Sequence, residues 1–179
     1  MKIGFIGSGN MGGAIARGIV KSGVVSGKDV YLYDVIPAAS AALANDIGGT
    51  AVNTPEELTG AADLFVLAVK PVYVKDALRA CYAGLAGKAV VSIVAGLSGA
   101  ALAKQLPEGT RCLQTMPNTP AMVNEGVTAL CEENTLTEDE LAFVRRMFSA
   151  IGRVYTVPVS YTHLDVYKRQ SLCCLPGAC

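Results

Sequence analysis

The 179-residue sequence has no tryptophan, a single histidine and few charged residues, which make up 17% of the chain. Its 15 lysines and arginines balance its 15 aspartates and glutamates, so no net field attracts it to nucleic acid or to a membrane surface. The longest uncharged run, Ala89 to Ala103, is interrupted by glycine and serine and is shorter than the roughly 20 apolar residues of a membrane-spanning helix. We therefore expect a cytoplasmic protein that binds neither nucleic acid nor membrane.

The sequence also lacks the paired cysteines and histidines of a metal site. Three of its six cysteines stand singly among apolar residues, and we expect them to be reduced, buried thiols: Cys81, Cys112 and Cys131. The other three fall in the last seven residues, near His163, at a spacing that matches no metal or catalytic site. We predict no metal.

The opening of the chain carries the most informative pattern. A short apolar run, Ile3 to Ile6, leads into Gly7-x-Gly9-x-x-Gly12, and a helical pattern follows from Asn10 to about Lys21. In this context the pattern is typical of a dinucleotide-binding turn. The first glycine permits the tight turn, the second lets the backbone approach a pyrophosphate, and the third lets the helix pack closely on its strand. The N–H groups of the first helical turn then favour a bound anion. The alternative is a glycine-rich turn in an α/β domain without this ligand.

Asp34 ends the second predicted strand, Val30 to Tyr33, and lies 22 residues after Gly12. An acidic residue near this place accepts hydrogen bonds from the ribose hydroxyls of NAD, and it would repel the 2′-phosphate of NADP. Asp34 therefore favours NADH over NADPH. The alternative is a solvated aspartate in a turn.

Short apolar runs and helical patterns alternate through the rest of the first 157 residues. We predict further strands at 51–52, 64–69, 88–95, 110–114, 127–131 and 153–157, and helices at 37–46, from 55 onward, and at 72–81, 98–105 and 137–149. The run 64–69 contains no polar residue, as is typical of a strand buried on both faces. The sequence predicts an α/β fold over residues 1–158: a Rossmann-type, doubly wound, mainly parallel sheet with helices on both faces.

Two further segments are expected at the carboxyl edge of this sheet. Lys70 follows the run 64–69, beside the topological switch point where ligands bind in such sheets, although a solvated turn lysine is the alternative. Met116 to Pro120 contains two prolines and reads as a rigid loop that would hold Asn118 and Thr119 at the same edge.

Four segments, in this order and at this spacing, resemble the N-terminal half of the pyrroline-5-carboxylate reductase family: GFIGSGNMG at 4–12, LAVKP at 67–71, SIVAGLS at 92–98 and MPNTPAMVNEG at 116–126. The resemblance implies NADPH- or NADH-dependent reduction of the small imine 1-pyrroline-5-carboxylate to L-proline, the last step of proline biosynthesis. The residues expected at the cofactor are Ile6, Gly7, Ser8, Gly9, Asn10, Met11, Gly12, Asp34, Leu67, Ala68, Val69, Lys70 and Pro71. Those expected near the substrate and the nicotinamide are Ala95, Gly96, Asn118, Thr119 and Pro120.

The sequence departs from the reductase pattern at three positions. Gln114 stands where the family usually has an arginine, and Pro55 stands where many members have an asparagine near the adenosine ribose. Asp34 occupies a place where NADPH-preferring members avoid an acid. The choice between NADH and NADPH therefore stays open at this point.

The family continues with a helical second domain that forms the homodimer and holds the substrate, and its catalytic residues are expected there. Residues 159–179 show neither helical nor strand periodicity and do not resemble that domain. We interpret them as a non-native tail and expect this chain to bind cofactor as a half-enzyme without turnover. Two alternatives share the glycine pattern: another Rossmann dehydrogenase, of the 3-hydroxyisobutyrate or prephenate type, and a non-catalytic nucleotide-binding regulatory module.

Overall fold

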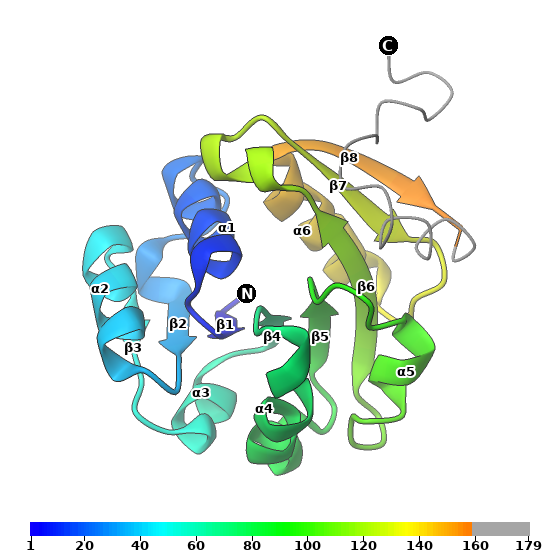
Figure 1. The fold of residues 1–179 in the computed structure, drawn as a ribbon, viewed down its shortest axis with the longest axis horizontal. Helices are drawn as coiled ribbons and strands as arrows, with labels where there is room; N and C mark the ends of the chain where they lie inside the picture. Colours follow the sequence, from blue (N-terminus) through cyan, green and yellow to red (C-terminus); the bar gives the residue numbers. More distant parts are fainter. Residues whose placement is uncertain (159–179) are drawn as a thin grey trace.

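Residues 1–158, which the computed structural model describes, contain one sheet of eight strands in the order β3-β2-β1-β4-β5-β6-β7-β8 (Figure 1). The strands are β1 Ile3–Ile6, β2 Val30–Tyr33, β3 Thr50–Ala51, β4 Leu64–Leu67, β5 Ala89–Ser92, β6 Arg111–Pro117, β7 Gly126–Cys131 and β8 Gly152–Val157. The α-helices are α1 Asn10–Lys21, α2 Pro37–Ile47, α3 Pro55–Ala61, α4 Val74–Cys81, α5 Gly99–Ala103 and α6 Glu138–Ser149. Four short 3₁₀ helices are η1 Gly27–Asp29, η2 Pro71–Tyr73, η3 Tyr82–Leu85 and η4 Thr119–Val123.

The order of the strands creates a switch point between β1 and β4. The chain builds β1, β2 and β3 outward in one direction, and then returns to the other side of β1 to build β4, β5 and β6. All pairs from β3 to β6 are parallel, β6 and β7 are antiparallel, and β7 and β8 are parallel. Since parallel strands end at the same edge, the loops after β1 and β4 face each other across this point.

Helices cover both faces of the sheet, as predicted. Alternate strand residues point to opposite faces, so Phe5 and Val66 belong to a core cluster with α1, α2 and α6. Ile6 and Phe65 belong to a second cluster with α3, α4 and α5. All four residues of β4 are buried because they pack against helices on both sides. The predicted doubly wound, mainly parallel architecture is confirmed.

The starts of the helices follow from local sequence. The Thr137 hydroxyl accepts a hydrogen bond from the Glu140 N–H, and the Glu140 carboxylate accepts one from the Thr137 N–H, which closes a capping box before α6. Thr54 and Ser98 cap α3 and α5 in the same way through their hydroxyls. The predicted starts of these helices are confirmed.

The structure corrects several predicted boundaries. β4 and β5 end at Leu67 and Ser92, earlier than predicted, and the helix predicted for 72–81 is divided into η2 and α4. The largest correction concerns β6, which continues through Met116 and Pro117 instead of giving way to a loop. These residues pair with Ala129 and Thr128 of β7, a contact between distant segments that local sequence does not reveal.

The three cysteines predicted to be reduced and buried are free and buried in the structure. Burial raises the pKa of Cys81 to about 11 and also raises the pKa values of Cys112 and Cys131. These thiols therefore stay protonated and unreactive at neutral pH. The interpretation of the tail, with His163 and the other cysteines, falls on residues outside the described range. No helix within residues 1–158 has both the length and the apolar character to cross a bilayer.

Candidate functional site

The carboxyl edge of the sheet brings together the loops that the sequence singled out. Residues 7–9 follow β1, residues 34–36 follow β2 and residues 68–71 follow β4. Residues 93–98 follow β5. Because β1, β2, β4 and β5 are parallel, these loops leave the sheet on one side, around the switch point.

Two of the three fingerprint glycines are required by the fold itself. Gly7 has a φ of +102°, and a Cβ placed on it would lie 2.7 Å from the carbonyl oxygen of Ala68. A Cβ on Gly12 would lie 2.8 Å from the Gly7 oxygen and 3.0 Å from the Ala68 side chain. Gly7 thus permits the turn, and Gly12 permits α1 to pack against β1 and β4.

Gly9 is different from its two neighbours in the fingerprint. Its φ of −72° and ψ of −170° are accessible to any residue, and a Cβ placed on it would meet no protein atom within 4 Å. Gly9 is also exposed to solvent. Neither backbone conformation nor internal packing accounts for glycine at this position, so the open space in front of Gly9 is free for a ligand.

The first turn of α1 borders this space. Gly9 is the N-cap residue, no side chain caps the helix, and its first turn contains no acidic residue. The unpaired N–H groups of a helix start, together with its dipole, attract an anion. The hydroxyl of Ser8 is buried and is the one buried side-chain polar atom in the described part of the chain without a hydrogen-bond partner. These features fit a phosphate-bearing group at the turn.

Asp34 is joined to the glycine turn by its carboxylate. Its Oδ2 accepts a hydrogen bond from the Ser8 N–H at 2.7 Å, and its Oδ1 accepts one from the Ile36 N–H at 2.9 Å. The structure therefore places Asp34 beside the fingerprint, and the sidechain is more firmly held than a solvated turn aspartate would be.

Lys70 and Pro71 lie at the exposed start of η2, directly after the buried strand β4. The Lys70 side chain makes no ion pair with any described residue. Ala68 and Val69 contact the Gly7 turn, since a Cβ on Gly7 would touch both. Of this predicted group, Leu67 is buried in the sheet and so supports the site without lining it.

The residues predicted near the substrate lie in the loops after β5 and β6. Ala95 and Gly96 are exposed, and Gly96 has a φ of +76°. The Asn118 side chain is oriented by one hydrogen bond, in which its Oδ1 accepts from the Val127 N–H at 2.8 Å. Thr119 and Pro120 are exposed at the start of η4. A role of these residues at a substrate stays a prediction.

Gln114 is a supporting residue whose role the sequence did not reveal. It is 3% exposed, and its Oε1 accepts a hydrogen bond from the Gly99 N–H at 3.1 Å. It thereby fixes the start of α5 and the end of the loop that contains Ala95 and Gly96. The sequence feature that could have indicated this role is a polar residue within a predicted strand, since a buried polar group needs a hydrogen-bond partner.

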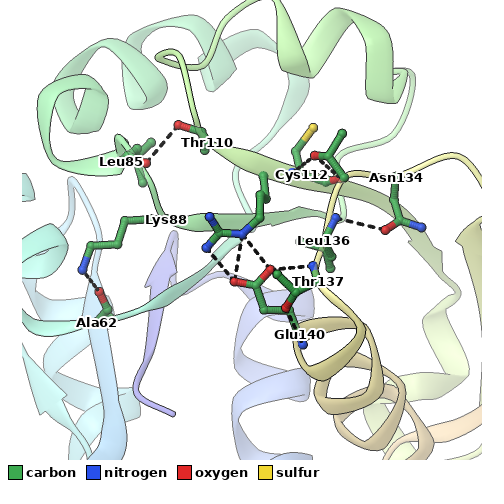
Figure 2. A network of polar contacts seen from close by, with 11 residues as sticks. Ala62, Leu85, Lys88, Thr110, Cys112, Asn134, Leu136, Thr137 and Glu140 are labelled. Atoms are coloured by element: carbon green, nitrogen blue, oxygen red, sulfur yellow. Dashed lines mark hydrogen bonds and ion pairs between the residues drawn. The ribbon is translucent and has the colours of Figure 1, made fainter.

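The clearest ion pair of the described residues lies away from this edge, at the start of β6 (Figure 2). Arg111 donates through Nε and Nη2 to both carboxylate oxygens of Glu140, at 2.7 to 3.1 Å. The hydrogen bonds from Arg111 lower the pKa of Glu140. Because this pair joins β6 to α6 at the amino edge of the sheet, it supports the fold and not the candidate site.

Known proteins resemble this chain in sequence. Pyrroline-5-carboxylate reductase from Escherichia coli (strain K12) is 35% identical over 163 residues, which cover 90% of this chain and 61% of the relative. The enzyme of the same name from Methanosarcina acetivorans is 32% identical over 160 residues, covering 89% of this chain and 59% of the relative. The chain thus spans about three fifths of the length of these curated relatives.

Solved structures show the same likeness. Pyrroline carboxylate reductase from Plasmodium falciparum, solved with NADP bound, has 25% identity and a TM-score of 0.81, covering 93% of this chain and 61% of that one. The Coxiella burnetii pyrroline-5-carboxylate reductase has 26% identity and a TM-score of 0.81, covering 87% of this chain and 58% of that one. Prephenate dehydrogenase from A. aeolicus, at 16% identity and a TM-score of 0.73, shares the fold.

The resemblance to pyrroline-5-carboxylate reductases that the four sequence segments carry is therefore confirmed, over the N-terminal part of those enzymes. A family model described as "NADP oxidoreductase coenzyme F420-dependent" matches residues 2–96, which include the glycine turn, Asp34, the loop after β4 and the first part of the loop after β5. The chain belongs to this oxidoreductase family.

Proposed function

We propose that this chain is the nicotinamide-dinucleotide-binding part of a reductase that converts 1-pyrroline-5-carboxylate to L-proline. The open space at Gly9 is the observation that carries the proposal. The fold needs Gly7 and Gly12, but a Cβ at Gly9 would meet no protein atom. Glycine at this position is explained by a ligand whose pyrophosphate approaches the backbone.

The chain's own groups would hold the coenzyme at three places. The N–H groups at the start of α1 would bind the pyrophosphate. Asp34 would accept hydrogen bonds from the adenosine ribose, since a carboxylate has about four acceptor sites and two are in use within the protein. The loops at 68–71, 95–96 and 118–120 would border the nicotinamide and the imine. A reduced nicotinamide supplies a hydride to the C=N carbon, and the protein's contribution is to orient the two groups.

The substrate class is supported by the curated relatives, which are named pyrroline-5-carboxylate reductase at 31 to 35% identity. The prephenate-type alternative is supported by the shared fold alone, and fold does not determine substrate. We place the reaction in the cytoplasm. We also propose that the protein has no nucleic acid or membrane partner, and its balanced charge supports this. The homodimer implied by the reductase resemblance would form through that family's second domain.

The Gly9→Ala variant tests the proposal. Isothermal titration calorimetry of the full chain would measure its dissociation constants for NADH and for NADPH. The added methyl group would displace the pyrophosphate and cost at least one charge-assisted hydrogen bond, each worth about 1.5–3 kcal/mol. We therefore expect the dissociation constant to rise at least about tenfold. The melting temperature should fall only slightly, because the methyl group meets no protein atom and only the weaker N-cap preference of alanine lowers stability.

Gly60→Ala is the matched control. Gly60 lies in α3, and a Cβ placed on it also meets no protein atom within 4 Å. It should leave coenzyme binding unchanged. A folded wild-type chain that binds neither coenzyme, or a Gly9→Ala chain that binds as tightly as the wild type, would contradict the proposal.

A further inference from the structure

We propose that the site is selective for NADH over NADPH and that Asp34 sets this selectivity as a carboxylate fixed in place by the backbone. The inference rests on the proposed dinucleotide site and goes beyond it, because relatives of this fold are found with either coenzyme. The Plasmodium falciparum reductase holds NADP, and a variant of an imine reductase from Myxococcus stipitatus is seen with NAD+.

The first argument is geometric. Asp34 Oδ2 lies 2.7 Å from the Ser8 nitrogen, and Oδ1 lies 2.9 Å from the Ile36 nitrogen. The two N–H groups belong to different segments, the glycine turn and the turn into α2. Rotation of the carboxylate away from a ligand would break both hydrogen bonds and leave the part-buried Ser8 N–H without its partner, which is unfavourable. The hydrogen bond from Ser8 therefore opposes movement of the Asp34 charge away from a phosphate.

The second argument concerns the neighbouring side chains. The segment from Tyr33 to Ala42 contains no lysine or arginine. Val35 and Ile36 are 84% and 63% exposed, so the turn presents apolar surface to solvent. The Ser40 hydroxyl donates to the Pro37 carbonyl oxygen. This turn therefore offers no cation to a 2′-phosphate.

Two other cations, Arg17 and Lys2, are engaged elsewhere. Arg17 of α1 forms an ion pair with Asp46 near the end of α2, away from the Asp34 turn. Lys2 lies over the ring of Tyr31, at the opposite end of β2 from Asp34. A 2′-phosphate would thus face a fixed carboxylate without a compensating charge from these residues.

The two coenzymes differ at the group that meets Asp34. The 2′-hydroxyl of NADH can donate a hydrogen bond to the carboxylate, whereas the 2′-phosphate of NADPH carries most of two negative charges at neutral pH. Like charges a few ångströms apart repel strongly near a protein surface. We expect NADH to bind at least about tenfold more tightly than NADPH.

The test is isothermal titration of the full chain with each coenzyme, and the readout is the ratio of the two dissociation constants. Asp34→Ser removes the charge, and Val35→Arg adds a cation at an exposed position while leaving both Asp34 hydrogen bonds in place. Each should shift the ratio toward NADPH by about tenfold. If Asp34→Ser does not fold, as judged by circular dichroism, Asp34→Asn takes its place because it keeps one acceptor oxygen.

Asp29→Asn is the matched control, because this substitution also removes one carboxylate. Asp29 lies directly before β2, at the end of the strand opposite Asp34. It should leave the ratio unchanged. Equal or tighter wild-type binding of NADPH would overturn the selectivity while the dinucleotide site stands. An unchanged ratio in the Asp34 variant would overturn the role of Asp34. Failure of a folded chain to bind either coenzyme would contradict the dinucleotide site, and this inference with it.

Discussion

The two edges of the sheet differ in one respect, which is that the carboxyl edge also keeps polar groups without a partner in the described part of the protein. At the amino edge, polar groups are paired with one another. The Arg111 guanidinium binds the Glu140 carboxylate, the Lys88 ammonium donates to the Ala62 carbonyl at 2.9 Å, and the Thr110 hydroxyl donates to the Leu85 carbonyl at 2.9 Å (Figure 2). At the carboxyl edge, the start of α1 has no side-chain cap and Lys70 is exposed without an ion pair among residues 1–158.

The difference separates the sources of stability and binding in this chain. The paired groups at the amino edge connect the starts of β4, β5 and β6 to one another, to η3 and to α6. Unpaired N–H groups at the carboxyl edge keep their hydrogen-bonding capacity for a ligand. Substitutions at the first edge should change the free energy of unfolding, whereas most substitutions at the second should change coenzyme affinity.

Gly7 should be the exception to this division, and it gives the largest expected change in stability. Gly7→Ala would place a methyl group 2.7 Å from the Ala68 carbonyl oxygen at a φ of +102°. Strain at such a backbone conformation and the contact with Ala68 should together lower the free energy of unfolding by about 3 kcal/mol. Urea denaturation would measure the free energy of unfolding. The comparison with Gly9→Ala is decisive, because an equal loss of stability in both variants would contradict the distinction between the two glycines.

Glu140→Gln should have the next largest effect. The substitution removes the negative charge from a side chain that is 12% exposed and leaves the half-buried Arg111 without its counterion. Glutamine still fits the capping box. We expect the free energy of unfolding to fall by about 1–2 kcal/mol, with coenzyme affinity unchanged. Asp46→Asn breaks the exposed Arg17 pair and serves as the control, with an expected change of less than about 0.5 kcal/mol.

The pH dependence of stability should show the smallest effect. Arg111 lowers the pKa of folded Glu140 below its ordinary value of 4.5, so Glu140 stabilises the fold fully above that pH. The contribution is lost as the pH falls through the lowered pKa. The difference in unfolding free energy between wild type and Glu140→Gln should therefore narrow below about pH 4.5. A difference that stays constant from neutral to acidic pH would mean that the ion pair does not link β6 to α6 energetically.

The sequence predicts most of the fold because its signals are local. The glycine fingerprint and the periodic apolar residues after it place α1 at Asn10–Lys21, as observed. Thr137 and Glu140 form the predicted start of α6 because a capping box needs residues only three positions apart. The apolar run of β4 identifies a strand buried on both faces for the same local reason.

The differences arise where distant segments decide the structure. The sequence predicted that this strand ends at Gln114, but β6 continues to Pro117 because its last residues pair with β7. The hydrogen bond from the Val127 N–H to the Asn118 side-chain oxygen also joins two separate segments, and the role predicted for Asn118 near a substrate stays a prediction. The double attachment of Asp34 to Ser8 and Ile36 depends on how two loops meet, which no sequence spacing specifies. The sequence thus indicates which loops meet at the carboxyl edge, whereas the hydrogen bonds that orient their residues were not foreseeable.

The close packing along α1 has a mechanical consequence. Gly18, in the last half of this helix, lies so close to the Ile151 side chain that a Cβ there would clash, and η4 also packs against α1 (Figure 1). Gly18 is about 13 Å along the helix axis from Gly9, at 1.5 Å per residue. The end of α1 that lies farther from Gly9 is therefore held in place by the segment before β8. A shift of that segment would be expected to tilt α1 and so displace the N–H groups that we propose bind the pyrophosphate, without touching any residue of the candidate site.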